Sequence, residues 1–364
     1  MQDCDVIVIG AGMAGASIAT ELAARQARVI VLEMEDAPGR HTTGRSAALF
    51  SEIYGNAVIR ALTRASRPRL AEGFMTPRDC LHIASAEQLE RLEAYAALPD
   101  VAGASRRVSA AEAIALCPIL RPDYVAGALA ELNAYDIDVD ALHQAYLRQI
   151  RSLGGAVICD ARLERAERTD GVWTVTAGGA AYRAPILVNA AGAWGDVVAA
   201  LAGVAPLGLA PKRRTIAIVP APKDGRCDDS PFVVDVDEQF YFKAEAGRIM
   251  ISPADETPSD PCDAAPDELD VAIAIDRAQA AADLPVTRVL SSWAGLRTFA
   301  PDRTPVLGFD AAAAGFFWCV GQGGYGIQTA PAMGGLGAAL VLGAAPPAGL
   351  EDLDPALLSP ARFG

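Results

Sequence analysis

The sequence predicts an α/β protein with two domains. One is a Rossmann-like dinucleotide-binding domain built from a discontinuous chain, and the other carries a mixed or antiparallel sheet. Three observations lead to this prediction. The chain opens with an apolar run, a glycine-rich turn and a helical pattern, and a similar pattern returns after residue 184. Residues 213–222 and 231–256 alternate apolar and polar side chains, as antiparallel strands do. With 364 residues, 52% of them hydrophobic, the chain is long enough to bury a large core.

The opening stretch DVIVIGAGMAGASIATELAARQARVIVLE predicts a βαβ unit, with strands at residues 6–9 and 29–32 and a helix over residues 16–26. Its turn carries the spacing G-x-G-x-x-G at Gly10, Gly12 and Gly15. Glycines here let the backbone approach a pyrophosphate, which the positive end of the helix attracts. Glu33 ends the second strand, where an acid accepts hydrogen bonds from ribose hydroxyls. The alternative is a glycine-rich turn of purely structural use.

Two further segments bear on the same site. HTTGRSAALFSEIYG, at residues 41–55, is rich in small and hydroxyl side chains that suit a flat ring lying against backbone, although a solvated loop is the alternative. APILVNAAGAWGDVVAALAGV, from residue 184, is again a strand, a glycine turn at Gly192 and a helix. The nucleotide domain is therefore expected to be discontinuous.

Composition excludes several classes of protein. The chain has 45 acidic and 31 basic residues and a formal net charge of −14, which argues against a nucleic-acid partner. Its seven cysteines are scattered, so the sequence suggests neither a zinc site nor a disulfide framework, and it indicates a reducing, cytoplasmic location. The acidic start does not fit an export signal. No uninterrupted run of about 18 apolar residues predicts a membrane span, and peripheral attachment to the inner membrane stays open.

Several motifs in order resemble the D-amino-acid oxidase superfamily of flavin-dependent oxidoreductases, which includes glycine and sarcosine oxidases. They are the glycine fingerprint, HTTGRSAA, LVNAAGAWGD, SWAGLRTFAPDRTPVLG and GFFWCVGQGGYGIQTAPAMG. Within that superfamily, GRSAA, DALHQAYLR, LAGV, PLGL, PKRR and QGGYGIQT are most similar to the bacterial D-arginine dehydrogenases. The resemblance implies an FAD-binding domain of residues 1–75, 135–205 and 290–364. It implies a substrate-binding domain of residues 76–134 and 206–289.

The resemblance also implies non-covalent FAD, because relatives with covalent flavin carry a Cys just after the clamp arginine, where this chain has Thr298 and Phe299. The helix expected after residue 328 would point its N-terminus at the flavin pyrimidine ring and stabilise negative charge there. The expected cofactor-binding residues are Gly10, Gly12, Met13, Ala14, Gly15, Glu33, Met34, Thr42, Thr43, Arg45, Ser46, Ala47, Ala48, Ala191, Gly192, Trp194, Arg297, Gly323, Gly324, Tyr325, Gly326, Ile327 and Gln328.

For the substrate, the resemblance implies an amino-acid carboxylate held by arginine, since a bidentate guanidinium fixes Cα for hydride transfer to flavin N5. Arg297 and Arg214 match the clamp positions, although Arg213 competes with Arg214 and Arg297 has a structural ion pair as its alternative. Tyr54, Tyr241, Leu49 and Gly324 complete the expected substrate-binding residues, although Tyr241, in FYFK, has ordinary strand packing as its alternative. No residue is expected to act as a catalytic base. His41 lies in the loop before the flavin contacts, and Cys319 is expected to be a buried filler.

The expected reaction is oxidation of a D-amino acid to an imino acid, which water converts to a 2-oxo acid and ammonia, with a quinone or other carrier preferred over oxygen as electron acceptor. Neutral side chains are expected, because relatives that bind cationic substrates carry His and Glu where this chain has Leu49 and Cys80. Glu52 and Asp79 are two nearby acids that would restore a cation site. Alternatives are a D-arginine or D-lysine dehydrogenase, an oxidase of glycine, N-methyl or 2-hydroxy acids, and a non-catalytic flavin-binding protein. The oligomeric state is not predicted.

Overall fold

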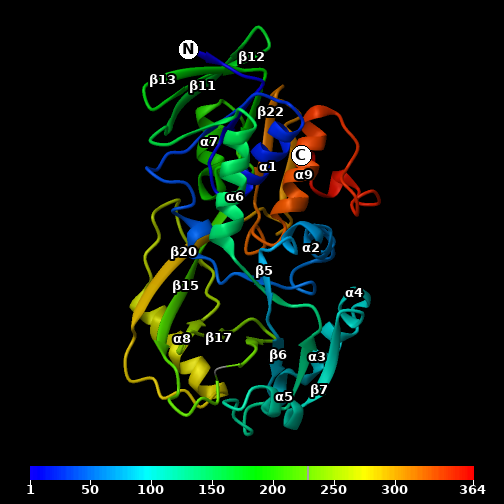
Figure 1. Ribbon diagram of the computed structural model, residues 1–364, viewed down its shortest axis with the longest axis vertical. Helices are drawn as coiled ribbons and strands as arrows, with labels where there is room; N and C mark the ends of the chain where they lie inside the picture. The colour runs from blue at the N-terminus through cyan, green and yellow to red at the C-terminus, as the bar shows by residue number, and fades with distance from the viewer. Residues whose placement is uncertain (228) are drawn as a thin grey trace.

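A computed structural model describes residues 1–227 and 229–364. In these residues the strands form four sheets, and the first is the six-stranded sheet of the dinucleotide-binding region (Figure 1). All its neighbouring strands are parallel except the last pair. In spatial order the strands are β10 Ala156–Ile158, β3 Val29–Leu32, β2 Val6–Ile9, β14 Ile186–Asn189, β22 Phe316–Val320 and β21 Val306–Phe309. The strands predicted at residues 6–9 and 29–32 are confirmed, as is the discontinuous chain.

Both faces of this sheet are buried, which explains why its strands are continuously apolar rather than alternating. Val6 and Val8 pack on one face with helices α1 and α9, while Ile7 and Ile9 pack on the other with a four-stranded sheet and α7. The helices around the sheet are α1 Met13–Ala24, α2 Ala57–Leu70, α6 Val139–Ser152, α7 Gly195–Leu201 and α9 Ala330–Leu342. The four-stranded sheet contains β1 Gln2–Asp3, β13 Ala180–Ala184, β12 Val172–Ala177 and β11 Leu163–Thr169.

The second large sheet has nine strands and forms the other end of the elongated molecule (Figure 1). Its main path is β19 Thr257–Pro258, β15 Ala210–Pro220, β18 Arg248–Ser252, β17 Tyr241–Glu245, β16 Phe232–Asp235, β6 Cys80–Ala84, β8 Gly127–Glu131 and β7 Ser105–Ser109, with β20 Ser291–Phe299 also paired to β15. Near it lie α3 Leu89–Ala96, α4 Pro99–Ala102, α5 Ala110–Leu116 and α8 Glu268–Ala281. The predicted antiparallel strands between residues 213 and 256 are confirmed, and so is the α/β fold class.

The two large sheets meet through shared segments. A small sheet of β4 Leu49–Phe50, β9 Tyr135–Ile137 and β5 Met75–Pro77 lies between them. Strand β20 follows the predicted start of the last FAD-domain segment at residue 290, yet it pairs with β15 of the nine-stranded sheet from Ser291 to Phe299. The predicted domain limits stay a prediction. In the described part of the chain, no helix is both long and apolar enough to cross a membrane.

Candidate active site

The glycine turn after β2 builds one wall of a cavity of about 340 Å³. Gly10 has φ +100°, and a Cβ there would lie 2.7 Å from the Ala190 carbonyl oxygen. A Cβ on Gly15 would lie 1.8 Å from the Gly10 carbonyl oxygen. The turn can therefore pack this closely against β14 and α1 only with glycine at both positions.

Backbone amides hold two polar side chains, Glu33 and Thr43, in place near the end of β3 and the start of α1. The Glu33 carboxylate is buried and accepts hydrogen bonds from the Ala11 amide at 2.8 Å and the Glu35 amide at 3.1 Å. The Met13 amide donates to the Thr43 hydroxyl at 3.0 Å, which ties the glycine turn to the 3-10 helix Thr42–Arg45. Both Glu33 and Thr43 line the cavity, so the first βαβ unit and the following loop form one concave surface.

Most of the residues expected to bind the cofactor line this cavity. They are Gly10, Gly12, Met13, Ala14, Glu33, Met34, Thr42, Thr43, Arg45, Ser46, Ala47, Ala191, Gly192, Trp194, Arg297, Gly323, Gly324, Gly326 and Ile327. Gly15 does not line it and lies behind the turn instead, while Ala48, Tyr325 and Gln328 line a second cavity. Arg45 donates hydrogen bonds to the Ala264 and Ala294 carbonyls and forms an ion pair with Asp263. It therefore also connects residues 263–264 with strand β20.

The second cavity measures about 610 Å³ and meets the first at a common wall. Of the described residues, seven line both cavities: Ser46, Ala47, Arg214, Tyr241, Arg297, Gly324 and Ile327. Four of them, Arg214, Tyr241, Arg297 and Gly324, are expected substrate-binding residues, and the other two, Tyr54 and Leu49, line the second cavity alone. The structure thus brings all six expected substrate residues to one place beside the glycine turn.

Arg297 lies on β20 at this junction and contacts the Tyr54 hydroxyl at 3.2 Å. Among the described residues no carboxylate lies within ion-pair distance of its guanidinium, unlike most arginines that line the two cavities. Burial raises the pKa of Tyr54, and the nearby Arg297 charge opposes that rise. A Cβ on Gly324 would lie 2.7 Å from the guanidinium, so glycine leaves room for it. A part-buried guanidinium without a carboxylate is suited to bind one from a ligand.

The Tyr241 hydroxyl supports the same interpretation. It is buried at the junction and has no hydrogen-bond partner among the described residues. A buried hydroxyl without a partner is unfavourable unless a ligand or water supplies one.

Arg214 and Arg213 point to different sides of β15, because successive side chains of a strand alternate. Arg214 is buried, lines both cavities, and donates to the Asp255 carbonyl at 2.8 Å. Arg213 donates to Asp270 of α8 at 2.7 Å and lines neither cavity. The geometry therefore favours Arg214 over Arg213 as a ligand contact.

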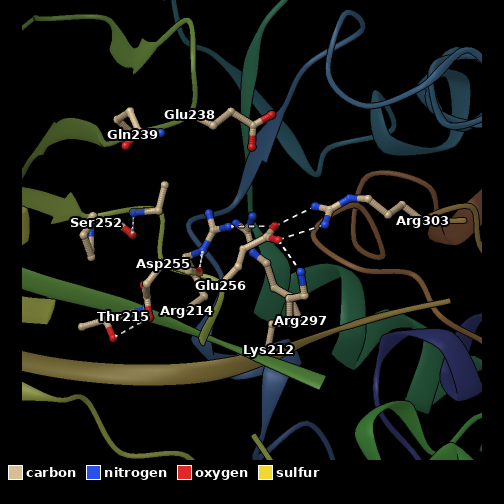
Figure 2. Close-up of polar contacts among 12 residues, drawn as sticks. Lys212, Arg214, Thr215, Glu238, Gln239, Ser252, Asp255, Glu256, Arg297 and Arg303 are labelled. Atoms are coloured by element: carbon tan, nitrogen blue, oxygen red, sulfur yellow. Dashed lines mark hydrogen bonds and ion pairs between the residues drawn. The ribbon is translucent and has the colours of Figure 1, made fainter. Parts of the chain in front are cut away.

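A cluster of charges lies beside Arg214, and Figure 2 shows the Glu256 carboxylate at its centre. Glu256 contacts Arg303 at 2.6 Å, Lys212 at 2.8 Å and Arg214 at 3.6 Å. Hydrogen bonding to Arg303, helped by Lys212, lowers the pKa of Glu256 to about 2. One carboxylate faces three cations, and two of these cations, Arg214 and Arg303, line the second cavity.

Comparison with known proteins decides the family. The FAD dependent oxidoreductase family, DAO, matches residues 5–340. The chain belongs to this family. FAD is its cofactor.

Individual relatives are more distant. FAD-dependent oxidoreductase domain-containing protein 1 of Bos taurus is 29% identical over 178 residues, a match that covers 43% of this chain and 35%, about a third, of that protein. An L-proline dehydrogenase from P. horikoshii superposes with a TM-score of 0.85 at 20% identity, covering 100% of this chain and 98% of that one. A glycine oxidase from Geobacillus kaustophilus gives 0.81 at 23% identity, covering 94% and 96%. These structures show a shared fold. Special closeness to the D-arginine dehydrogenases is not confirmed.

The residues of the first cavity fit FAD. Glycine turn amides and the N-terminus of α1 suit its pyrophosphate, and a buried carboxylate at Glu33 suits a ribose hydroxyl. Among the residues that the structure describes, no cysteine lines this cavity, and Thr298 and Phe299 follow Arg297 on β20. Cys319 is buried on β22, as expected of a filler.

Sequence reasoning missed several charged residues of the second cavity. Asp235, Asp237, Glu238, Arg91 and Arg303 line it, and the Glu238 carboxylate lies 3.5 Å from the Tyr54 hydroxyl. Figure 2 shows Glu238 apart from the Glu256 cluster. The acidic turn DVDEQF was visible in the sequence, but nothing in it showed which cavity it faces.

Glu52 and Asp79, the two acids that would restore a site for a cationic side chain, do not lie at the second cavity. Glu52 is buried and pairs with Arg67 at 3.1 Å, and Asp79 is exposed. Neither lines the second cavity, and Cys80 does not line it either.

Proposed function

We propose that this FAD-dependent oxidoreductase oxidises the Cα–N bond of D-amino acids to imino acids, which water hydrolyses to 2-oxo acids and ammonia. One observation carries the proposal. Arg297, a guanidinium without a carboxylate partner among the described residues, lies where the cavity that fits FAD meets the second cavity. When bound, FAD would accept the hydride that leaves Cα. The substrate ammonium first loses one proton to water, and the lone pair of the neutral amine then forms the C=N bond as the hydride leaves.

The chain positions the substrate. Arg297 holds the substrate carboxylate through a bidentate, charge-assisted contact, and the Tyr54 and Tyr241 hydroxyls add hydrogen bonds. Arg214, which lines the same junction, adds positive charge. With the carboxylate fixed, rotation about the remaining bonds is restricted, and Cα faces the first cavity.

The preference for D stereochemistry is supported by the sequence resemblance rather than by the fold, since a structure of similar fold is an L-proline dehydrogenase. We propose neutral side chains as the preferred class, because Leu49, Phe232 and Val234 line the second cavity. D-arginine or D-lysine is the second candidate, which Glu238 and Asp237 favour.

Three finer points belong to the same proposal. FAD is bound without a covalent link, so acid precipitation releases free flavin into the supernatant. Artificial dyes or quinones accept electrons faster than oxygen does. The scattered cysteines support a cytoplasmic location.

A single anaerobic screen tests the proposed function. FAD-loaded protein is mixed with D- and L-enantiomers of leucine, methionine, phenylalanine, arginine and proline, and with glycine, sarcosine and 2-hydroxy acids. We expect D-amino acids to bleach the oxidised flavin absorbance fastest. Faster bleaching by L-enantiomers, sarcosine or hydroxy acids would reassign the substrate. No bleaching by any of them would favour a flavin-binding protein without this activity.

A further inference from the structure

Cys80, His82 and Glu131 form a buried cluster at the wall of the second cavity, which His82 lines. Their sulfur, nitrogen and oxygen atoms lie within 4.8 Å of one another. The His82 Nε2 is 3.7 Å from the Cys80 sulfur and 3.7 Å from a Glu131 oxygen. The cluster could not be predicted from the sequence, because Glu131 is far along the chain from Cys80 and His82.

Strand geometry brings the three side chains together. Cys80 and His82 are two residues apart on β6, so they lie on the same face of the sheet. Glu131 lies on the antiparallel neighbour β8, directly opposite Cys80. Because all three lie on paired strands inside the nine-stranded sheet, their backbone positions are fixed by the sheet.

The charge in this cluster is not balanced. The Glu131 side chain is 0% exposed, and its oxygens accept hydrogen bonds from the Ser51 hydroxyl at 2.8 Å and the Glu52 amide at 2.6 Å. Among the described residues, its only candidate cation within 4 Å is His82. That distance of 3.7 Å is longer than a charge-assisted hydrogen bond. A buried carboxylate without a full counter-charge is costly, and a bound cation would remove that cost.

We propose that Cys80, His82 and Glu131 bind a divalent transition metal of the zinc type. Thiolate, imidazole and carboxylate are the ligands that zinc prefers, and tetrahedral zinc with bonds of about 2.0–2.3 Å separates its ligand atoms by about 3.3–3.6 Å. The two distances of 3.7 Å from the His82 Nε2 need only a small contraction, and the Cys80 sulfur and Glu131 oxygen, which lie within 4.8 Å of each other, have to come closer. Binding displaces the Cys80 thiol proton to solvent.

The surroundings complete such a site. The Ser51 and Glu52 contacts orient the Glu131 carboxylate, as partners of metal ligands do. Three protein ligands leave a fourth position for water or a donor from the cavity. His82 and Ser51 both line the second cavity, so the metal lies directly behind the wall that faces the substrate side chain.

The test uses FAD-loaded protein that has been treated with a chelator and desalted, then titrated with ZnCl₂ by calorimetry. We expect one zinc per chain. Cys80→Ser and Glu131→Gln should each weaken binding about tenfold or more. Cys262→Ser, at an exposed cysteine outside the cluster, is the matched control and should bind as the original protein does. Absence of binding, unchanged binding in both cluster variants, or loss of binding in Cys262→Ser would overturn the proposal.

Cobalt gives a second readout that does not depend on the variants. Co²⁺ at this site should show strong tetrahedral ligand-field bands at longer wavelengths than oxidised flavin absorbs. Thiolate-to-cobalt charge transfer should appear in the near ultraviolet, in the difference spectrum against the same flavoprotein without cobalt. Weak octahedral bands without charge transfer would show that the thiolate is not a ligand. Flavin content, measured for each variant, identifies any variant that has lost its fold. His82→Gln then replaces that variant in the titration.

Discussion

The two cavities that meet at Arg297 are built in different ways. Many glycines and alanines of the first cavity lie in the turns after β2 and β14 and in the loop that precedes α9. The second is lined by charged and aromatic side chains from β6, α3, β15, β16, β20 and the loops between them. One cavity is therefore shaped by backbone, and the other by side chains that separate segments bring together.

This difference predicts different sensitivity to mutation. Where backbone makes the surface, an added Cβ pushes against main-chain atoms that cannot move without disturbing the core. Where side chains make the surface, removing one charge leaves the fold intact and changes what binds. Each variant below tests one side of this comparison.

The largest effect is expected for Gly15→Ala. Alanine favours helix over glycine by about 1 kcal/mol, so propensity alone predicts stabilisation within α1. The new Cβ, however, would lie 1.8 Å from the Gly10 carbonyl oxygen. We expect the purified variant to lack bound flavin and to unfold at a clearly lower temperature, measured by absorbance and thermal denaturation.

Gly335→Ala is the matched control, because Gly335 is also helical but its Cβ would meet only Pro347 side-chain atoms at 3.4 and 3.6 Å. It should keep flavin and its unfolding temperature. A Gly15→Ala protein that keeps its flavin and its unfolding temperature would show that the glycine turn tolerates a side chain at this position.

Arg297→Ala is expected to give the next largest effect. Loss of the charge-assisted contact should raise KM and lower kcat. The resulting fall in kcat/KM should correspond to a loss of about 2–4 kcal/mol of transition-state stabilisation. Steady-state kinetics with the best substrate from the screen measures this. Arg213→Ala, one strand position from Arg214 and paired with Asp270 outside the cavities, should remain near the original kcat/KM. Near-normal kinetics in Arg297→Ala would place the substrate carboxylate elsewhere.

The same contrast explains what the sequence could predict. The glycine turn, both strands of the first βαβ unit and Glu33 lie within one local stretch, so spacing alone located them. Arg297, Arg214 and Tyr54 came only through resemblance to a family.

Glu238 and the Glu131 cluster could not be found, because strand pairing between β6, β8 and β16 decides which residues meet. The pairing of β20 with β15 in the nine-stranded sheet could likewise not be predicted. Pairing between segments that are distant in sequence leaves no local sequence pattern. Glu52 is close to Tyr54 in sequence, and Asp79 is next to Cys80, but neither lines the second cavity. Glu52 pairs with Arg67, and Asp79 is exposed.

Glu256→Gln tests the charge cluster beside Arg214. Its folded pKa of about 2 is below the ordinary value of 4.5, so its stabilising contribution is complete above pH 4.5 and is lost as pH falls toward 2. We expect the variant to lose about 1–2 kcal/mol of unfolding free energy at pH 7, because partial exposure screens the ion pairs. The difference from the original protein should shrink in acid.

Denaturant unfolding at pH 7, 5 and 3 measures the effect of Glu256→Gln. Asp276→Asn, at an exposed position of α8, is the control and should change little at any of these pH values. An equal deficit for Glu256→Gln at every pH would mean that the Glu256 charge is not what stabilises the cluster.

The smallest effect is expected for Glu238→Gln, which sharpens the choice of substrate side chain. Glu238 is exposed and lines the second cavity, so solvent screens its attraction for a cationic side chain. We expect the ratio of kcat/KM for D-arginine to that for D-leucine to fall about threefold, while Asp79→Asn leaves the ratio unchanged. In the original protein D-leucine, D-methionine and D-phenylalanine should remain better substrates than D-arginine. If kcat/KM for D-arginine exceeded that for D-leucine tenfold or more, about 1.4 kcal/mol, the predicted preference for neutral side chains would be wrong. If Glu238→Gln then abolished that difference, Glu238 would be the residue that mainly selects the cationic side chain.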